Sequence, residues 1–261
     1  AARRGGGDDG VPAAALDQRN GQFLDIAELA PALPPDPALD AGVQQAERLG
    51  DGLIASRLLP VRMLRRRCRS ALQGGVVEHM RAVESLGARA VKVRAAEDLV
   101  DAAGHPRIDA LILPGGESSA IDKLARAFGV AEPLRQTQLP VFATCAGLIY
   151  SARELENPAP GQQTLGLIDV TVRRNAFGNQ RFSEERTVPV TAGEETLDIE
   201  ASFIRAPLVT RVGEGVEVIA TVPGEDGDAV VGVRQGRVTA LSFHPEENGD
   251  ARVHAAWLDS F

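Results

Sequence analysis

The sequence has little of several features that mark particular classes of protein. It has only two cysteines in 261 residues, and no Cys/His cluster has the spacing of a zinc site. Two cysteines cannot make a disulfide framework, so a reducing, cytoplasmic location is expected. No apolar run approaches the roughly 18 residues of a membrane span. Residues 1–5 lack the apolar core of a secretory signal, so neither a membrane nor an export route is predicted.

The sequence also lacks an excess of basic charge. Its formal net charge is −8, which argues against nucleic acid as the main partner because phosphate binding needs a basic surface. With 44% hydrophobic and 25% charged residues, the composition is that of an ordinary globular protein. The length allows one good-sized domain or two small ones.

The first 69 residues differ in composition from the rest. Residues 5–10 are rich in glycine and residues 31–37 in proline, as in flexible or extended linkers. A basic run follows at residues 62–69. We therefore expect residues 1–69 to form a disordered extension and residues 70–261 to form the folded domain. A small helical interaction arm is the alternative for the extension.

From residue 70 onward, short apolar runs alternate with helical patterns. Strands are predicted at 90–93, 109–113 and 141–144, and helices at 76–86, 95–103 and 118–128. Such alternation predicts a parallel sheet covered by helices on both faces. After about residue 171 strands follow one another, for example at 188–190, 216–222, 229–234 and 238–242, before a closing helix at 250–261.

Cys145 is the first candidate for chemistry. It directly follows the apolar strand at 141–144 and precedes Ala146, Gly147 and a helical run at 148–154. A thiol at a strand-to-helix turn is lifted above the sheet, near the positive end of the helix dipole and near backbone N–H groups that bind an oxyanion. A buried structural cysteine is the alternative, and the turn alone does not decide between them.

A Gly-Gly turn follows another strand. Pro114-Gly115-Gly116-Glu117-Ser118-Ser119 comes directly after the strand at 109–113. Two glycines at the carboxyl end of a parallel strand let the backbone bend and turn N–H groups toward a ligand. A simple strand-to-helix turn with Ser118 as N-cap also fits.

His244 and Glu246 follow the strand at 238–242. In extended chain, side chains two positions apart point to the same side. Glu246 can therefore hold one imidazole nitrogen of His244 while the other nitrogen faces a nucleophile, the pairing that a catalytic thiol requires. In isolation, a His-x-Glu pair is usually ordinary surface chemistry.

Together, the three motifs follow three predicted strands in the order Gly-rich turn, Cys, His-x-Glu. In this the sequence resembles the class I glutamine amidotransferases, triad enzymes built on a flavodoxin-like sheet. Further motifs narrow the resemblance to the glutaminase subunits of pyridoxal 5′-phosphate synthases, over residues 71–261. They are Ala71-Leu72-Gln73-Gly74 with Glu78-His79, Leu113 to Ser118, Thr144 to Ile149, Arg174-Asn175-Ala176-Phe177-Gly178, Phe203-Ile204-Arg205-Ala206-Pro207 and Ser242 to Glu246.

The resemblance implies a flavodoxin-like three-layer α/β sandwich with a mostly parallel central sheet. It also implies hydrolysis of L-glutamine to L-glutamate and ammonia, with Cys145 as nucleophile, His244 as general base and acid, and Glu246 as the group that orients His244. The residues that match glutamine-binding positions are Gly116, Glu117, Ser118, Arg174, Ile204 and Arg205, and the oxyanion donors are the backbone N–H groups of Gly116 and Ala146. An arginine suits a substrate with an α-carboxylate, because a guanidinium binds it through two hydrogen bonds.

The resemblance further implies a partner. In the family, ammonia passes to a separate synthase subunit that builds the pyridoxal 5′-phosphate ring, so a hetero-oligomeric complex is expected. No metal and no bound cofactor is implied for this chain.

The sequence departs from the family at two places. Ala143 replaces the usual glycine two residues before the cysteine, a small addition that we expect the turn to tolerate. More seriously, residues 65–70 (RRRCRS) replace an apolar first strand, and burying so many unpaired guanidinium groups is costly. We therefore expect a short first strand or a less stable domain. Since the chain opens with Ala1, we hypothesise that residues 1–69 arise from a frame error, an upstream mis-start or a fused fragment; an unbroken reading frame with an intact start would disprove this.

Three other functions fit parts of the pattern. A class I amidotransferase that serves another acceptor is opposed by the Arg174 and 203–207 motifs. A non-catalytic partner subunit is opposed by the intact Cys145, His244 and Glu246 set and favoured by the polar first strand. A Cys peptidase on the same sheet would hydrolyse peptides with no partner present.

Overall fold

The structure is a computed structural model that describes residues 67–71, 75–176, 185–224 and 227–261. All of them belong to one compact unit. The predicted extension up to residue 66, and the motif residues 72–74, 177 and 178, lie outside the described residues. Within the described ranges, no helix is long and apolar enough to cross a membrane.

Five parallel strands form one half of the main sheet. Their order is β2-β1-β3-β4-β12, and each neighbouring pair is parallel. This is the order of the flavodoxin-like doubly wound sheet, so the predicted fold class is confirmed. The strands are β1 (Arg67–Ala71), β2 (Arg89–Val93), β3 (Ala110–Leu113), β4 (Val141–Thr144) and β12 (Val238–Leu241).

Alternate residues of the central strands enter two separate cores. In β3, Leu111 and Leu113 belong to one hydrophobic cluster, and Ile112 belongs to another. Successive side chains of a strand point to opposite faces, so the two clusters lie on the two faces of the sheet. All residues of β3, β4 and β12 are buried, as expected for parallel strands covered on both sides.

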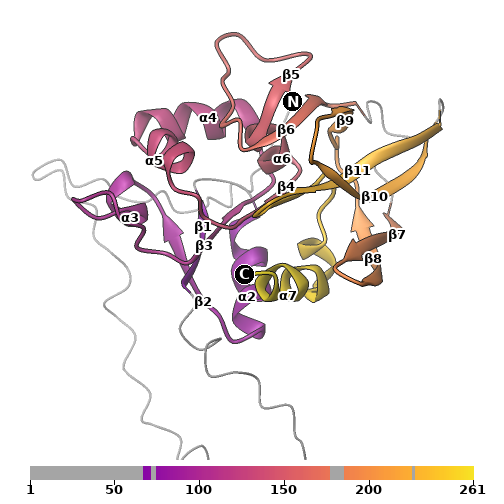
Figure 1. The fold of residues 1–261 in the computed structure, drawn as a ribbon, viewed down its shortest axis with the longest axis horizontal. Coiled ribbons are helices and arrows are strands. Elements are labelled where there is room, and N and C mark those ends of the chain that lie inside the picture. The colour runs from indigo at the N-terminus through magenta and orange to yellow at the C-terminus, as the bar shows by residue number, and fades with distance from the viewer. Residues whose placement is uncertain (1–66, 72–74, 177–184, 225–226) are drawn as a thin grey trace, which may run out of the picture. The chain divides into compact units, whose positions relative to one another are not determined.

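Helices cover both faces (Figure 1). Residues of α4 (Ser118–Ala127), α5 (Ala131–Gln136) and α6 (Ala146–Ser151) join the cluster of Leu111 and Leu113. Residues of α2 (Val76–Ser85) and α7 (Arg252–Asp259) join the cluster of Ile112. The result is a three-layer sandwich in which the helices shield the strands from water.

The second half of the chain extends the sheet with antiparallel pairs, except that β5 and β6 are parallel. Beyond β12 the order continues β11-β9-β6-β5, β10 pairs with β11, and β7 and β8 form a separate hairpin. These strands are β5 (Ala152–Leu155), β6 (Ile168–Arg173), β7 (Glu185–Ala192), β8 (Glu195–Ser202), β9 (Leu208–Val212), β10 (Glu217–Gly224) and β11 (Gly227–Gln235). A bridge between Ser202 and His244 joins the end of β8 to the chain after β12.

The first strand differs from the expectation. β1 begins at Arg67, inside the segment predicted to precede the domain, and it pairs with β2 on one side and β3 on the other. Pairing uses the backbone, which does not depend on the side chains. The neighbour β2 is the edge strand, and Arg89, which is opposite Arg67, is exposed. A polar strand start is therefore compatible with this position, one strand from the edge.

Two helices end earlier than the sequence pattern predicts. The pattern at 95–103 forms only α3 (Ala96–Leu99), because Asp101 accepts backbone N–H bonds from Ala103 and His105 and starts a turn. The helix after Cys145 ends at Ser151, and residues 152–155 pair with β6 instead.

Candidate active site

Cys145 lies in a strained turn between β4 and α6. Its φ of 48° and ψ of −103° fall where non-glycine residues are rare. Its N–H donates to the Leu241 carbonyl at 2.8 Å, which anchors the turn to β12. Gly147 must be a glycine because a Cβ there would lie 1.9 Å from the Leu113 carbonyl oxygen. Close packing of α6 on β3 thus maintains the strained conformation of the thiol-bearing residue.

His244 is positioned by the neighbouring hairpin and by the Gly-Gly turn. Its N–H donates to the Ser202 carbonyl at 3.1 Å. A Cβ on Gly115 would lie 2.0 Å from Cε1 of the His244 ring, so the imidazole occupies the space that the missing side chain leaves. The glycine turn after β3 and the histidine after β12 are therefore in direct contact.

Glu246 orients the ring. It begins the short 3₁₀ helix η3 (Glu246–Asn248), and its Oε1 lies 2.8 Å from Nδ1 of His244. The side chain of Glu246 has no solvent exposure. A carboxylate only accepts hydrogen bonds, so Nδ1 carries a hydrogen and Nε2 is left to face the thiol.

The electrostatics of this group favour separated charges. Burial lowers the pKa of His244, but the hydrogen bond with Cys145 and the contact with Glu246 outweigh it and raise the pKa to about 10. Burial raises the pKa of Glu246, and hydrogen bonds from His244 and His79 overcome this and hold it well below its ordinary value. A cationic imidazole between a thiol and a carboxylate stabilises the thiolate, which is the reactive form of cysteine.

Two residues to which the sequence assigned no role complete this buried side. Thr144 Oγ1 accepts from the Gly115 N–H at 3.1 Å and donates to Glu246 Oε1 at 3.4 Å. His79, from α2, has its Nε2 3.2 Å from the same Glu246 oxygen. His79 belongs to the Glu78-His79 motif of the resemblance. The sequence feature that could have indicated its burial is its place on the same face of α2 as buried Val83.

On the exposed side, Glu117 caps α4. Its carboxylate accepts from the N–H groups of Ser119 at 3.2 Å and Ala120 at 2.7 Å, so Glu117, and not Ser118, is the N-cap. Burial raises the pKa of Glu117, but the hydrogen bonds from Ser119 and Ala120 and the charge of Arg174 bring it below its ordinary value. Arg174 donates to Glu117 at 3.2 Å, which joins two predicted glutamine-binding residues.

Except for Ser118 in α4, the other predicted binding residues lie outside the helices and strands. Arg174 follows β6, and its backbone N–H and carbonyl both bond the Asn157 side chain, at 2.7 and 3.0 Å. Ile204 and Arg205 come just after Ser202, which pairs with His244. Ile204 is 46% exposed, and Arg205 has a φ of 47°. Gly116 has a φ of 149° and lies between the His244 contact and the Glu117 cap.

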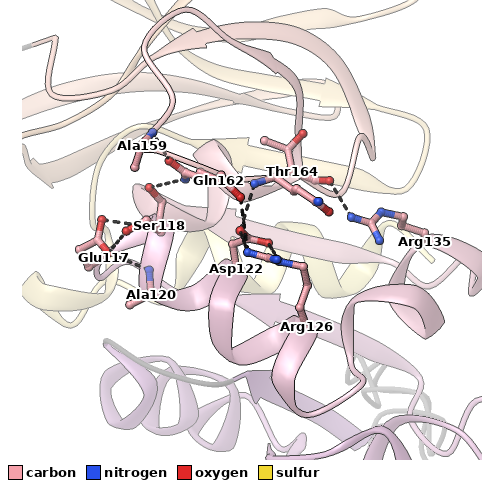
Figure 2. A network of polar contacts seen from close by, with 12 residues as sticks. Glu117, Ser118, Ala120, Asp122, Arg126, Arg135, Ala159, Gln162 and Thr164 are labelled. Atoms are coloured by element: carbon pink, nitrogen blue, oxygen red, sulfur yellow. Dashed lines mark hydrogen bonds and ion pairs between the residues drawn. The ribbon is translucent and has the colours of Figure 1, made fainter.

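A polar network fixes the loop between β5 and β6 on α4 (Figure 2). Gln162 donates to Ser118 Oγ at 3.0 Å, and the Gln163 N–H donates to Asp122 at 3.0 Å. Asp122 also binds Arg126 through two hydrogen bonds of 2.9 Å. The sequence did not indicate these contacts. They fix the position of Ser118, a predicted glutamine-binding residue, through the hydrogen bond from Gln162.

The combination of a flavodoxin-like sheet, a cysteine at a strained strand-to-helix turn and a His–Glu pair defines the class of thiol amidohydrolases to which glutamine amidotransferases belong. Consistent with this, the SNO glutamine amidotransferase family model matches residues 70–261. The chain belongs to this family, and the resemblance identified from its motifs is confirmed.

Several relatives are close in sequence. The pyridoxal 5′-phosphate synthase subunit PdxT of Corynebacterium glutamicum (strain R) is 57% identical over 193 residues, which cover 72% of this chain and 92% of the relative. The subunit of the same name from Cutibacterium acnes is 54% identical over 194 residues, with 72% and 92% coverage. A solved structure described as a glutamine amidotransferase has a TM-score of 0.63 at 42% identity, and the match covers 73% of this chain and 97% of that one.

Proposed function

We propose that this protein is the glutaminase subunit of a pyridoxal 5′-phosphate synthase, which hydrolyses L-glutamine to L-glutamate and ammonia with Cys145, His244 and Glu246. The single observation that carries the proposal is the chain of contacts between Cys145, His244 and Glu246. Cys145 lies in a strained turn and is hydrogen-bonded to His244, and His244 Nδ1 lies 2.8 Å from Glu246 Oε1. The family membership and the PdxT relatives support the same reaction and the same kind of partner.

The reaction proceeds by acyl transfer. The Cys145 thiolate attacks the side-chain amide carbon of glutamine, and the C–N bond breaks as His244 donates a proton to the departing ammonia. His244 then removes a proton from water, which attacks the thioester and releases glutamate and the free thiol. Glu246 keeps Nδ1–H of His244 fixed through both steps. The backbone N–H groups of Gly116 and Ala146 are proposed to bind the oxyanion of both tetrahedral intermediates.

The exposed side is proposed to bind the amino-acid end of glutamine. Arg174 offers a guanidinium for the α-carboxylate, and in the free protein that guanidinium is held by Glu117. Substrate then shares Arg174 with Glu117, which keeps the arginine in position before binding. Ser118, Ile204 and Arg205 complete the proposed glutamine site.

The ammonia is proposed to pass to a separate synthase subunit in a hetero-oligomeric complex, as the names of the relatives suggest. A cytoplasmic location is part of this proposal, because an unpaired reactive thiol persists in a reducing compartment; Cys145 is a free cysteine. The glutaminase domain is proposed to begin with β1, whose first three residues fall within the predicted extension of residues 1–69.

Glutamate release tests this function. The full chain should release glutamate from glutamine in the presence of the synthase subunit from the same organism, and Cys145→Ala should abolish release while still binding that subunit. Peptide hydrolysis without the partner would instead favour a peptidase. A folded wild-type protein that binds the synthase but releases no glutamate would contradict the proposal and favour a non-catalytic subunit.

A further inference from the structure

His79 is completely buried and lies behind the carboxylate of Glu246. It comes from α2, 167 positions before Glu246 in the sequence, and neither side chain has any solvent exposure. Burying polar rings is unfavourable unless their nitrogens find partners.

The hydrogen-bond inventory around His79 has one consistent solution at Nε2. This nitrogen lies 3.0 Å from Thr144 Oγ1 and 3.2 Å from Glu246 Oε1. The carboxylate can only accept, so Nε2 carries the hydrogen. Thr144 Oγ1 already uses its own hydrogen toward Glu246 at 3.4 Å. Its lone pairs then accept from His79 and from the Gly115 N–H.

All three donors therefore converge on one oxygen. Oε1 of Glu246 accepts from His244 and Thr144, and the single Nε2 hydrogen of His79, which bonds Thr144 Oγ1 at 3.0 Å, is shared with Oε1 at 3.2 Å. Oε2 has no hydrogen-bond partner among the described residues. A glutamate carboxylate bound through one oxygen can still turn about its Cγ–Cδ bond unless donors from several elements fix that oxygen. His79, on α2, and His244, after β12, contact this oxygen from two different parts of the fold. His79 thus limits this rotation.

His254, from α7, contacts the other ring nitrogen of His79. Its Nε2 lies 2.8 Å from Nδ1 of His79, so one hydrogen lies between the two nitrogens. Burial lowers the pKa of His254 to about 3, which keeps its ring neutral. When His79 is neutral with its hydrogen on Nε2, Nδ1 is an acceptor and His254 is the donor. Other carboxyl groups nearby are Glu78 in the same helix and Asp250 before α7.

We propose that His79 is a positioning residue for glutamine hydrolysis: its Nε2–H holds Glu246 so that Glu246 keeps His244 aligned with Cys145. The inference rests on the proposed function of Cys145, His244 and Glu246. His79 does not touch the substrate. Its effect is on the orientation of the base and on the stability of the thiolate–imidazolium pair.

Two substitutions of His79 by residues of similar size distinguish a hydrogen-bond donor role from a packing role. His79→Gln retains an N–H at about the reach of Nε2, and His79→Met fills similar space without a donor. We expect His79→Met to lower kcat at least about 10-fold with KM for glutamine nearly unchanged, short of the ~10⁴-fold loss known for removal of an orienting carboxylate. His79→Gln should recover most of the lost kcat.

The pH dependence of Cys145 alkylation gives a readout that does not need glutamine turnover. With iodoacetamide and detection of the Cys145 peptide by mass spectrometry, His79→Met should shift the reactivity profile to higher pH, and His79→Gln should lie near the wild type. Trp257→Phe is the matched control, because Trp257 packs in the same core, with its ring 5.5 Å from Phe142, and should lower Tm without moving the profile.

Unchanged kcat and an unchanged alkylation profile in His79→Met would overturn the proposal, as would equal losses in the Gln and Met variants that follow Tm alone. Failure of the wild type to hydrolyse glutamine would instead contradict the proposed function, and the alkylation profiles would still decide the role of His79. If His79→Met does not fold, ¹⁵N-histidine spectra of the wild type decide. The chain has only four histidines; a hydrogen on Nε2 of His79 is expected, and a bare Nε2 would overturn the proposal.

Discussion

The two sides of the candidate site are built differently. On the buried side, Glu246, Thr144 and His79 have no side-chain exposure or nearly none and contact one another within 3.4 Å. On the other side, the Glu117 side chain is 48% exposed, and Ile204 and Arg205 are exposed on a turn. The proposed catalytic groups are therefore held by the core, and the proposed glutamine contacts are held by loops and by one another.

This difference separates the groups proposed to carry out the reaction from those proposed to bind glutamine. A buried donor set is costly to disturb, because any group left unpaired keeps its full desolvation cost. Partly exposed pairs such as Arg174 and Glu117, whose side chains are 15% and 48% exposed, contribute less to stability than buried ones and can exchange partners when a ligand arrives. We therefore expect substitutions on the buried side to lower kcat and those on the exposed side to raise KM.

The largest effect is expected for Glu246→Gln. The amide keeps the shape of the side chain but loses the charge that stabilises the His244 imidazolium, and it can present an N–H to Nδ1 and favour the wrong tautomer. By analogy with other orienting carboxylates, kcat should fall by about 10³- to 10⁴-fold, with KM for glutamine within about threefold. Steady-state glutamate release checks this. A loss carried mainly by KM would show that Glu246 belongs to the recognition side.

Gly115→Ala should follow, because the added methyl would meet the His244 ring at 2.0 Å. The ring has to move, and a misplacement of about 1 Å can cost about 10²-fold in rate. The control is Gly193→Ala in the β7–β8 turn, where φ is 68° and a Cβ meets nothing within 4 Å. Gly193→Ala should cost about 1 kcal/mol of stability and keep its kcat. Full activity in Gly115→Ala would show that the ring does not need its present position.

The sequence predicted only part of the buried side of the site. The Gly-rich turn, Cys145 and His244 could be predicted as site residues because each follows an apolar run, and the carboxyl ends of neighbouring parallel strands meet at one edge of a sheet. His79 had no such mark. Its partners are 65 and 167 positions away, and a single histidine in a helical pattern carries no information about distant contacts.

At the first strand, the sequence argued against an element that the structure contains. The basic residues near Arg67 and Arg69 argued against a strand, because side-chain burial was weighed for a central position. Position in the sheet was the missing information: β1 is next to the edge strand β2. The central strands β3 and β4, whose residues are all buried, matched their predicted ranges almost residue for residue. Hydrophobic runs thus predict buried strands well and polar, near-edge strands poorly.

On the recognition side, Arg174→Lys should give a smaller effect. Lysine keeps the charge but cannot bind a carboxylate through two parallel hydrogen bonds, so KM for glutamine should rise about 10-fold with kcat nearly unchanged. Arg173→Lys is the matched control, since Arg173 is the neighbouring residue and pairs with Glu156 at 2.6 Å. Equal KM changes in the two variants would remove Arg174 from the proposed glutamine site.

The smallest effect concerns stability against pH, and it should distinguish the two sides once more. The pKa of His244 is raised from 6.5 to about 10, so its contribution to the free energy of unfolding is complete below pH 6.5 and is lost as the pH rises toward 10. The pKa of Glu246 is lowered from 4.5, so its contribution is present above pH 4.5 and is lost as the pH falls.

Thermal unfolding of the wild type should therefore give the highest Tm between about pH 4.5 and 6.5, with a fall of several degrees toward pH 10, since about 1 kcal/mol shifts Tm by roughly 2–4 °C in a chain of this size. His244→Gln should flatten the alkaline side of this curve. Glu117→Gln should change the curve little at any pH, because the Glu117 side chain is 48% exposed and water screens its interactions. An alkaline slope that persists in His244→Gln would place the titrating group elsewhere and weaken the assignment of a cationic His244 to the buried side.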